Sequence, residues 1–401
     1  MDVSYLTLHL AYNRNMSVSK KPLIIIISIL LVLATAGGMY AVLSNKPTKT
    51  DTATESNPST PAPVTPPKPT TLSCVESLPN DVLIGQKIMP ALFASQVNTL
   101  KAPFAETKVG GVIIMDEISA SDITAFKQGF AITPNIATDQ EGGTVQRYKS
   151  AGIMPGATDI ASSQTPQQAY TTYLSDAKYL ESIGITTNFA PVVDVASAEP
   201  NPLPGRMYSS DTKVVSEYAG QFIQATQKAN VTPVVKHFPG LGTTTTNTDN
   251  GSATTAPLAS LKTKDILPYQ SLAKYNSDAM ISNAIVPDLT NGQPAIWSPE
   301  AVALLRSQGY SNSVIYTDSL TANAIPGTIS DAALKTWQAG VDVALIVQRK
   351  QDVNNIHSIL QTTIANAQVA LTNGQLDKTK VAESVLRILQ RKNVDPCAIA
   401  Q

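Results

Sequence analysis

The chain has 401 residues, of which 43% are hydrophobic and 15% charged, so it is long enough to bury a sizeable core. Its formal net charge is −1, and it has neither a basic field nor an acidic tail, which argues against a nucleic-acid partner. Two cysteines and three histidines form no His/Cys cluster in the sequence, so we expect no metal site and no other cofactor.

An uncharged apolar run lies near the N-terminus. Residues 23–43 would span about 31 Å as a helix at about 1.5 Å per residue, which is enough to cross a bilayer. Three cations precede the run, the last at Lys21, so the positive-inside rule places residues 1–22 in the cytoplasm. We therefore predict a transmembrane signal anchor, with the rest of the chain extracellular or periplasmic. Secretion after signal cleavage is the alternative, because residues 34–36 (ATA) suit a cleavage site.

A Pro/Thr-rich segment follows the predicted anchor. Residues 46–71 hold seven prolines and eight threonines, a composition that cannot bury enough apolar surface to fold. The prolines favour extended conformations. We predict a linker over residues 44–73 that leads to a single domain at residues 74–401.

Apolar strands alternate with helical patterns through this domain. The predicted strands cover residues 109–115, 135–138, 187–195, 231–235, 279–286, 313–317 and 341–347. The helical patterns cover residues 79–100, 165–183, 211–229, 258–275, 299–308, 330–339, 353–372 and 378–390. Repeated β-α units with continuous apolar strands favour a parallel sheet, closed as a (β/α)8 TIM-type barrel. A doubly wound open sheet is the alternative, but the glycine-rich motif that binds dinucleotides in such sheets follows none of the predicted strands.

Charged residues gather where these strands end. The strand at 231–235 leads to Lys236 and His237, and then to a long loop opened by Pro239 and Gly240. The other charged residues at strand ends or on the loops that follow are Asp139, Glu141, Arg147, Asp194, Arg206 and Asp318. Any one of them alone is more often a cap or a structural ion pair. Together they predict an active site, because barrel enzymes build their sites at the carboxyl ends of the strands.

Four segments resemble glycoside hydrolase family 3, and specifically its single-domain bacterial β-N-acetylglucosaminidases. They are DQEGG with VQR at residues 139–147, NFAPVVDV at 188–195, KHFPG at 236–240 and IYTDSL at 315–320. The resemblance covers about residues 78–390. It implies a (β/α)8 barrel that releases terminal β-linked N-acetylglucosamine with retention, from cell-wall or peptidoglycan-derived glycans. It also implies that Asp318 is the nucleophile and that the sugar hydroxyls are bound by Asp139, Arg147, Arg206, Lys236 and His237. We expect a monomer.

The loop after KHFPG departs from the family pattern. Relatives carry an Asp-x-His pair there whose histidine is the acid/base, whereas this chain has Asn247, Thr248 and Asp249. A retaining glycosidase needs an acid/base besides the nucleophile, and Asp249 is the one titratable side chain that residues 243–250 offer, so we predict Asp249 as the acid/base. The alternatives are a catalytically impaired sugar- or wall-binding barrel, and a β-glucosidase of the same fold. The four threonines at 243–246 predict a mobile loop, which could hold Asp249 far from Asp318 in the absence of substrate.

The two cysteines bracket the predicted barrel. The first and last elements of a closed barrel are neighbours, and the predicted compartment is oxidising. We therefore predict a disulfide between Cys74 and Cys397. Two free buried thiols are the alternative.

Overall fold

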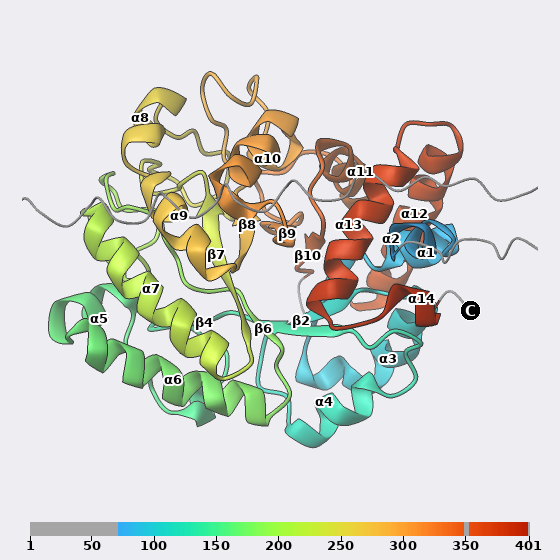
Figure 1. The fold of residues 1–401 in the computed structure, drawn as a ribbon, viewed down its shortest axis with the longest axis horizontal. Helices are drawn as coiled ribbons and strands as arrows, with labels where there is room; N and C mark the ends of the chain where they lie inside the picture. The colour runs from blue at the N-terminus through green and yellow to red at the C-terminus, as the bar shows by residue number, and fades with distance from the viewer. Residues whose placement is uncertain (1–70, 349–352, 400–401) are drawn as a thin grey trace, which may run out of the picture. The chain divides into compact units, whose positions relative to one another are not determined.

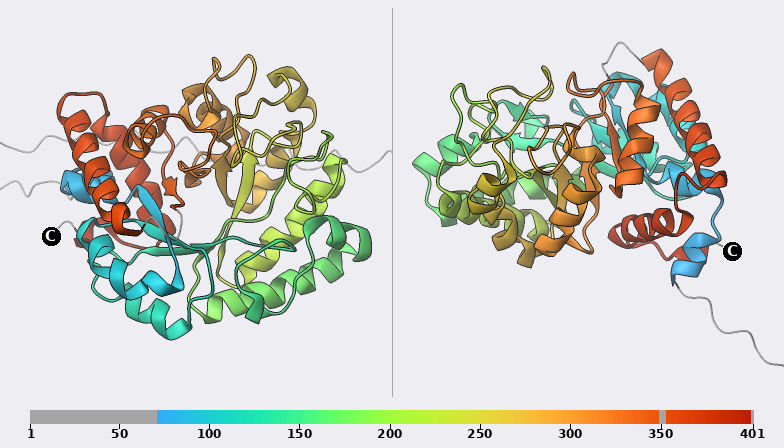
Figure 2. Two further views of the ribbon diagram at one scale, coloured as in Figure 1. Left: turned by 180° about the vertical axis from the view of Figure 1, so that it is seen from behind. Right: turned by 90° about the horizontal axis from the view of Figure 1, so that it is seen from above.

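The computed structural model describes residues 71–348 and 353–399. Strands lie at the centre of this part and helices lie outside them (Figures 1 and 2). The predicted anchor and nearly all of the predicted linker lie outside the described residues. In the part of the chain that is described, no helix combines the length and the apolar character that a membrane span needs.

Eight parallel strands form the central sheet, in the order β10-β1-β2-β3-β6-β7-β8-β9. Their bounds are Ile88–Leu92 for β1, Gly111–Ile114 for β2, Asn135–Thr138 for β3, Thr187–Asn188 for β6, Thr232–Phe238 for β7, Asp278–Ile281 for β8, Ile315–Thr317 for β9 and Ala344–Ile346 for β10. The two end strands meet through a parallel bridge between Tyr316 and Val343, so the sheet is a near-closed barrel. The predicted parallel barrel is confirmed in this form. A short antiparallel pair, β4 (Gln140–Gly142) with β5 (Val145–Gln146), follows β3.

Helices connect the strands and cover the outside of the barrel. They are α1 Thr71–Glu76, α2 Asn80–Gly85, α3 Val97–Glu106, α4 Ala120–Lys127, α5 Ala157–Ser163, α6 Pro166–Ser182, α7 Thr212–Lys228, α8 Leu258–Thr263, α9 Leu267–Leu272, α10 Pro299–Leu305, α11 Ile329–Ala339, α12 Val353–Thr372, α13 Lys378–Arg391 and α14 Pro396–Ile399. Several begin at side chains suited to capping: Thr165 accepts the N–H of Gln168 at the start of α6, and Asp211 accepts that of Lys213 at the start of α7. These caps explain why the predicted bounds of α6 and α7 are close to those observed.

Three of the predicted elements differ most in extent or type from those observed. The region 79–100, expected to be one helix, forms α2, β1 and α3. The apolar run Ile88–Leu92 is short and fully buried, and periodicity alone does not separate such a strand from a helix. The strand expected over 187–195 pairs as a regular ladder only at its start, Thr187–Asn188. The helix expected over 258–275 is divided, with Pro268 in the first turn of α9, where proline fits a new helix start.

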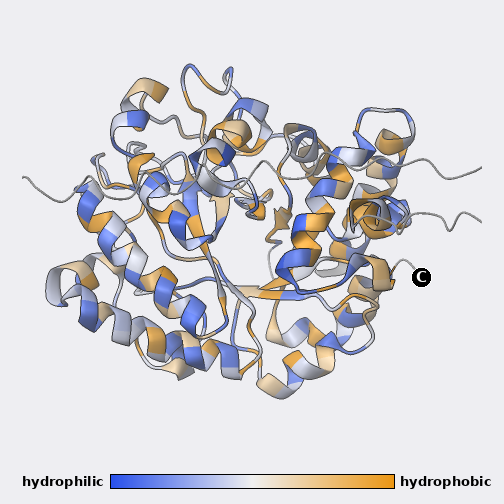
Figure 3. Ribbon diagram, viewed as in Figure 1, coloured by the Kyte–Doolittle hydropathy of each residue, from blue (hydrophilic) through white to orange (hydrophobic). Residues whose placement is uncertain are grey.

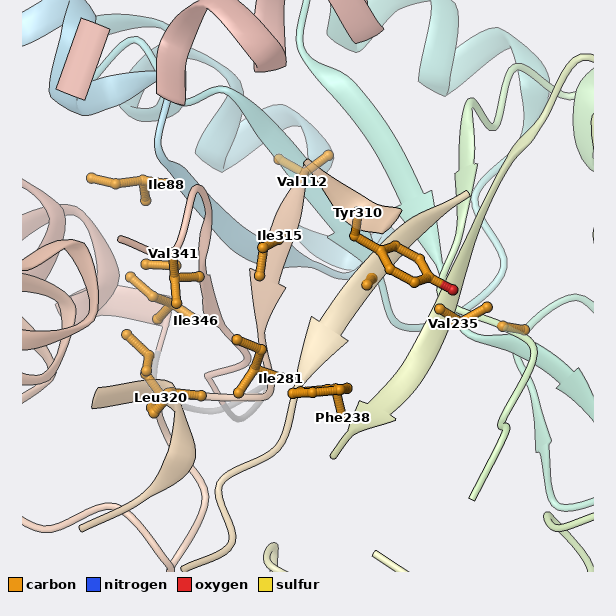
Figure 4. Packing of buried hydrophobic residues seen from close by; sticks show 14 of the residues in the cluster. Ile88, Val112, Val235, Phe238, Ile281, Tyr310, Ile315, Leu320, Val341 and Ile346 are labelled. Carbon is orange, nitrogen blue, oxygen red and sulfur yellow. The ribbon is translucent and has the colours of Figure 1, made fainter. Parts of the chain in front are cut away.

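Alternate residues of the strands pack on opposite sides of the barrel wall. One side faces the helices and holds Ile88, Val112, Val235, Ile281, Ile315 and Ile346 (Figure 4). The other side fills the barrel interior with Met89, Ile113, Val234, Met280, Tyr316 and Leu345. The helices carry hydrophobic and hydrophilic residues on different faces (Figure 3). The interior is therefore a packed core, and the space for a site lies at the carboxyl ends of the strands.

A disulfide joins the two ends of the domain. Cys74 in α1 and Cys397 in α14 are bonded, with their Cα atoms 5.0 Å apart and a sequence separation of 323. Closure of the barrel brings α1 and α14 side by side (Figures 1 and 2). The start of the domain is thereby tied to its end.

Candidate active site

A pocket of about 770 Å³ opens where the strands end. It is lined by all seven residues predicted for catalysis and sugar binding: Asp139, Arg147, Arg206, Lys236, His237, Asp249 and Asp318. They come from the ends of β3, β7 and β9, from the loops that follow these strands, and from the loop between β6 and α7, which carries Arg206. The fold thus brings together side chains that are as far as 179 positions apart in the sequence (318 − 139).

A network of ion pairs forms one wall of the pocket. Lys236 Nζ lies 2.8 Å from Asp139 Oδ1 and 2.6 Å from Glu141 Oε1. Arg206 donates two hydrogen bonds to Glu141, of 2.8 Å from Nε and 2.9 Å from Nη2. Arg147 Nη2 lies 3.3 Å from the second oxygen of Asp139. The network fixes three cations and two carboxylates against each other at the ends of β3 and β7.

These charges stabilise each other although they are buried. Burial opposes ionisation of Asp139, but the charges of Lys236 and Arg147 outweigh it and hold the pKa of that carboxyl well below its usual range. Burial likewise opposes ionisation of Glu141, whose pKa Lys236 and Arg206 lower. The pKa of Lys236 is raised, because the two carboxylates outweigh its own burial. A fixed array of ionised donors and acceptors is suited to binding adjacent hydroxyl groups.

His237 is held from behind by Asp194. Its Nδ1 lies 2.7 Å from Asp194 Oδ2, and Asp194 Oδ1 also accepts the N–H of Leu241 at 2.7 Å. Asp194 is fully buried, whereas His237 lines the pocket. With Nδ1 donating to the carboxylate, Nε2 is left as the ring nitrogen available to a ligand.

Asp318 is fixed at the end of β9. Its backbone N–H donates to the carbonyl oxygen of Ile281 at 2.8 Å, which continues the pairing of β8 with β9. Its Oδ1 accepts the N–H of Ser319 at 2.7 Å, and its Oδ2 accepts the hydroxyl of Thr248 at 3.4 Å. Each carboxylate oxygen therefore has one defined donor and a free lone pair, a geometry that suits a nucleophile.

The loop that carries Asp249 lies against the loop after β9. The N–H groups of Asn323 and Ala324 donate to the carbonyl oxygens of Asp249 at 3.3 Å and Thr248 at 3.1 Å. The loop also passes close to Val195, in the segment after β6: a Cβ at Gly242 would lie 1.9 Å from the backbone oxygen of Val195, so only glycine fits there. The loop that the sequence predicted to be mobile is thus held over the pocket.

Asp249 has the electrostatic character of a proton donor. Although Asp249 is exposed as a residue, the protein around its carboxyl group removes enough water to raise its pKa above the ordinary value, and the negative charge of Asp318 raises it further. His237 and Arg206 act in the opposite direction but do not cancel these effects. A carboxyl group whose pKa is raised is suited to general acid catalysis.

Two further pocket residues contact the predicted site residues, although neither of them had a specific role predicted from the sequence. Glu141 holds both Lys236 and Arg206, and its position just after a strand was the available signal. Thr248 contacts Asp318, and nothing in the local sequence points to that contact. Among residues 71–348 and 353–399, no group of three or more His, Cys, Asp or Glu side chains is arranged to hold a metal ion.

Comparisons with known proteins identify the family of this chain. Residues 81–391 match the model of the glycosyl hydrolase family 3 N terminal domain. The beta-hexosaminidase LpqI of Mycobacterium tuberculosis is 32% identical over 92% of this chain and 97% of its own length. An uncharacterized secreted glycosyl hydrolase of Arthroderma benhamiae is 30% identical over 71% of this chain and 84% of its own. A solved family 3 member from Mycobacterium smegmatis has a TM-score of 0.71 and 30% identity, over 79% of this chain and 98% of its own.

Proposed function

The chain belongs to glycoside hydrolase family 3, and from that membership we propose that it is a retaining β-N-acetylhexosaminidase. Its substrate would be a glycan that ends in β-linked N-acetylglucosamine. The observation that carries this proposal is the meeting of Asp318 and Asp249 in one pocket, where the charge of Asp318 helps to raise the pKa of Asp249. The similarity to a protein named beta-hexosaminidase over nearly its whole length supports the choice of sugar.

The proposed reaction proceeds through two displacements. An oxygen of Asp318 attacks the anomeric carbon while Asp249 gives its proton to the glycosidic oxygen, which leaves as an alcohol. The sugar is then joined to Asp318 as an ester. Asp249, now ionised, takes a proton from water, and the resulting hydroxide attacks the anomeric carbon and releases Asp318. Two inversions give net retention, and both carboxyl groups return to their starting states.

The ion-pair network is the proposed sugar clamp. Asp139, Arg147, Arg206, Lys236 and His237 would bind hydroxyl groups of the terminal residue through charge-assisted hydrogen bonds. Because the network is already ionised and paired, it needs little rearrangement when the sugar enters.

The raised pKa of Asp249 favours an active enzyme over an impaired binding barrel. The family histidine is absent, but an aspartate whose pKa is raised can give a proton in the first step. A β-glucosidase of the same fold is the other alternative, and substrate turnover separates it from the proposed activity.

We place the catalytic domain outside the cytoplasm, with cell-wall or peptidoglycan-derived glycans as its substrates. The support is the sequence of residues 23–43 and the similarity to a protein named as secreted. Protease added to intact cells should release a soluble fragment that contains the barrel. A barrel that stays protected inside the cell would contradict this placement.

The activity test uses the purified full chain with aryl β-N-acetylglucosaminide and aryl β-glucoside. We expect turnover of the first, release of the β-anomer by NMR, and loss of turnover in Asp318→Asn. Asp377→Asn is a matched control, because Asp377 is exposed and caps α13 away from the pocket. Turnover of the glucoside alone would identify a β-glucosidase. Sugar binding without turnover of either substrate would identify a binding module.

A further inference from the structure

The segment that follows β8, residues 282–286, is fixed against the loop after β7. Its Ile285 donates a backbone hydrogen bond to the carbonyl oxygen of Ala253 at 2.8 Å and accepts the N–H of Thr255 at 2.9 Å. Both partners belong to the loop that carries Asp249, close to where that loop ends. The first three residues of the segment, 282–284, are at most 1% exposed. A side chain from this segment therefore has a rigid base.

Asn283 reaches from this segment to the turn that carries the proposed nucleophile. Its side-chain Nδ2 donates to the carbonyl oxygen of Ser319 at 2.8 Å, in a buried contact. Because a carbonyl oxygen only accepts, the nitrogen of the amide has to face it, and the orientation of the amide is fixed. The N–H of Ser319 donates in turn to Oδ1 of Asp318 at 2.7 Å. Ser319 therefore connects the amide of Asn283 to the carboxylate of Asp318.

The amide of Asn283 contributes little to folding stability. Its Oδ1 is buried and has no hydrogen-bond partner in the described part of the chain, and an unpaired buried acceptor is destabilising. The carbonyl oxygen of Ser319 has a second donor, the N–H of Ala322 at 3.3 Å, so it would stay paired without Asn283. The side chain thus makes one hydrogen bond and leaves one acceptor unpaired, which nearly cancel. Its contact beside the nucleophile is where it can have an effect.

We propose that Asn283 is a positioning residue for the nucleophile, which fixes Ser319 so that its N–H stays on Oδ1 of Asp318. This inference rests on the proposed function, in which Asp318 attacks the anomeric carbon. Nucleophilic attack requires the reacting oxygen to stay aligned with that carbon. Without the amide, Ser319 is held less firmly, and the carboxylate of Asp318 spends less time in the reactive orientation.

Two variants of the full chain remove the amide: Asn283→Leu keeps the branched outline of the side chain, and Asn283→Ala adds no bulk. Both should lower kcat/KM about tenfold, equally for alkyl and activated aryl β-N-acetylglucosaminides, because the nucleophile is affected and the proton donor is not. The Kd of the uncleavable methyl 1-thio-β-N-acetylglucosaminide and the melting temperature should stay close to those of the parent chain. Asn366→Ala, at an exposed amide on α12 that donates to Ser330, is the matched control and should behave like the parent. An unchanged kcat/KM in both variants, or a loss confined to alkyl glycosides, would overturn the inference.

Crystal structures of the parent chain and of Asn283→Ala test the positioning without relying on turnover. In the variant, the carboxylate of Asp318 should leave the N–H of Ser319 or occupy more than one orientation. A carboxylate that keeps its place and its hydrogen bond would overturn the inference. If the parent chain cleaves neither kind of glycoside but the carboxylate moves in the variant, the proposed function is contradicted, and the positioning of Asp318 by Asn283 stands.

Discussion

The hydroxyl of Thr248 donates a hydrogen bond of 3.4 Å to Oδ2 of Asp318, and so links the loop after β7 to the end of β9. The same residue accepts the N–H of Ala324 through its carbonyl oxygen, and the next residue is Asp249. Thr248 is 1% exposed, so water does not replace its hydroxyl easily. One side chain therefore positions the proposed nucleophile while its backbone positions the proposed acid/base.

Thr248→Val should lower kcat on aryl β-N-acetylglucosaminide by about tenfold, because one oxygen of Asp318 loses its donor without a change in side-chain shape. Thr248→Ser keeps the hydroxyl and should retain most of the activity. KM should change little in either variant, since Thr248 is outside the proposed sugar clamp. Equal losses in Val and Ser would show that the threonine acts through packing alone.

The disulfide between Cys74 and Cys397 should contribute a few kcal/mol to the free energy of unfolding. Intact-mass measurement should show a gain of two hydrogens on reduction. The Cys74→Ala and Cys397→Ala variants should melt at lower temperature, by similar amounts, with the pocket still able to bind sugar. An unchanged mass on reduction would mean that the bond does not form.

Asp265 should make stability depend on pH. It is almost fully buried, and its Oδ1 has no hydrogen-bond partner in the described part of the chain. Burial, reinforced by the charge of Asp194, raises its pKa from 3.8 to about 7. Between these values the folded chain holds a proton that the unfolded chain has lost, so the free energy of unfolding falls as pH rises from about 4 to 7.

Asp265→Asn removes this effect while keeping the shape of the side chain. From pH 5 to pH 8, the free energy of unfolding of the variant should rise by about 2 to 3 kcal/mol relative to that of the parent chain. Denaturant unfolding at both pH values measures the difference. If the free energy of unfolding of the variant differs from that of the parent chain by the same amount at both pH values, Asp265 is not protonated in the folded chain at pH 5.

The positions of most site residues could be predicted because parallel strands end on one rim. Asp139 and Asp318 directly follow apolar strands and Lys236 lies near the end of one, so a barrel had to bring them together whatever the exact bounds of its strands. The strand β1 was missed, because five buried apolar residues between two helices carry no strand-specific period.

The contacts that organise the pocket could not be predicted in this way. Glu141 and Arg206 are 65 positions apart, and Thr248 and Asp318 are 70 apart. Their pairing depends on how two loops fold over the rim. The threonines of the β7 loop suggested mobility by composition, whereas backbone donors from Asn323 and Ala324, far along the chain, hold that loop in place.

Asp249 is the residue whose role most needs a direct test, because it stands where the family has a histidine. As an acid it must carry a proton in the first step, so activity on poor leaving groups should fall as pH rises through its raised pKa. In Asp249→Asn, this fall in activity at high pH should be absent. Its first step should slow by at least a hundredfold for alkyl glycosides and much less for activated aryl glycosides, whose oxygen departs with little protonation.

The second step of the reaction tests the role of Asp249 independently, with the same variant. With an activated aryl glycoside, Asp249→Asn should accumulate the sugar–Asp318 ester, because no base remains to deprotonate water. Added azide needs no base, so it should restore turnover and yield the β-glycosyl azide. Asp159→Asn, at an exposed carboxylate on α5, should behave like the parent chain throughout. If Asp249→Asn slows both kinds of glycoside equally and azide has no effect, another group supplies the proton, and the loop serves only to hold Thr248 against Asp318.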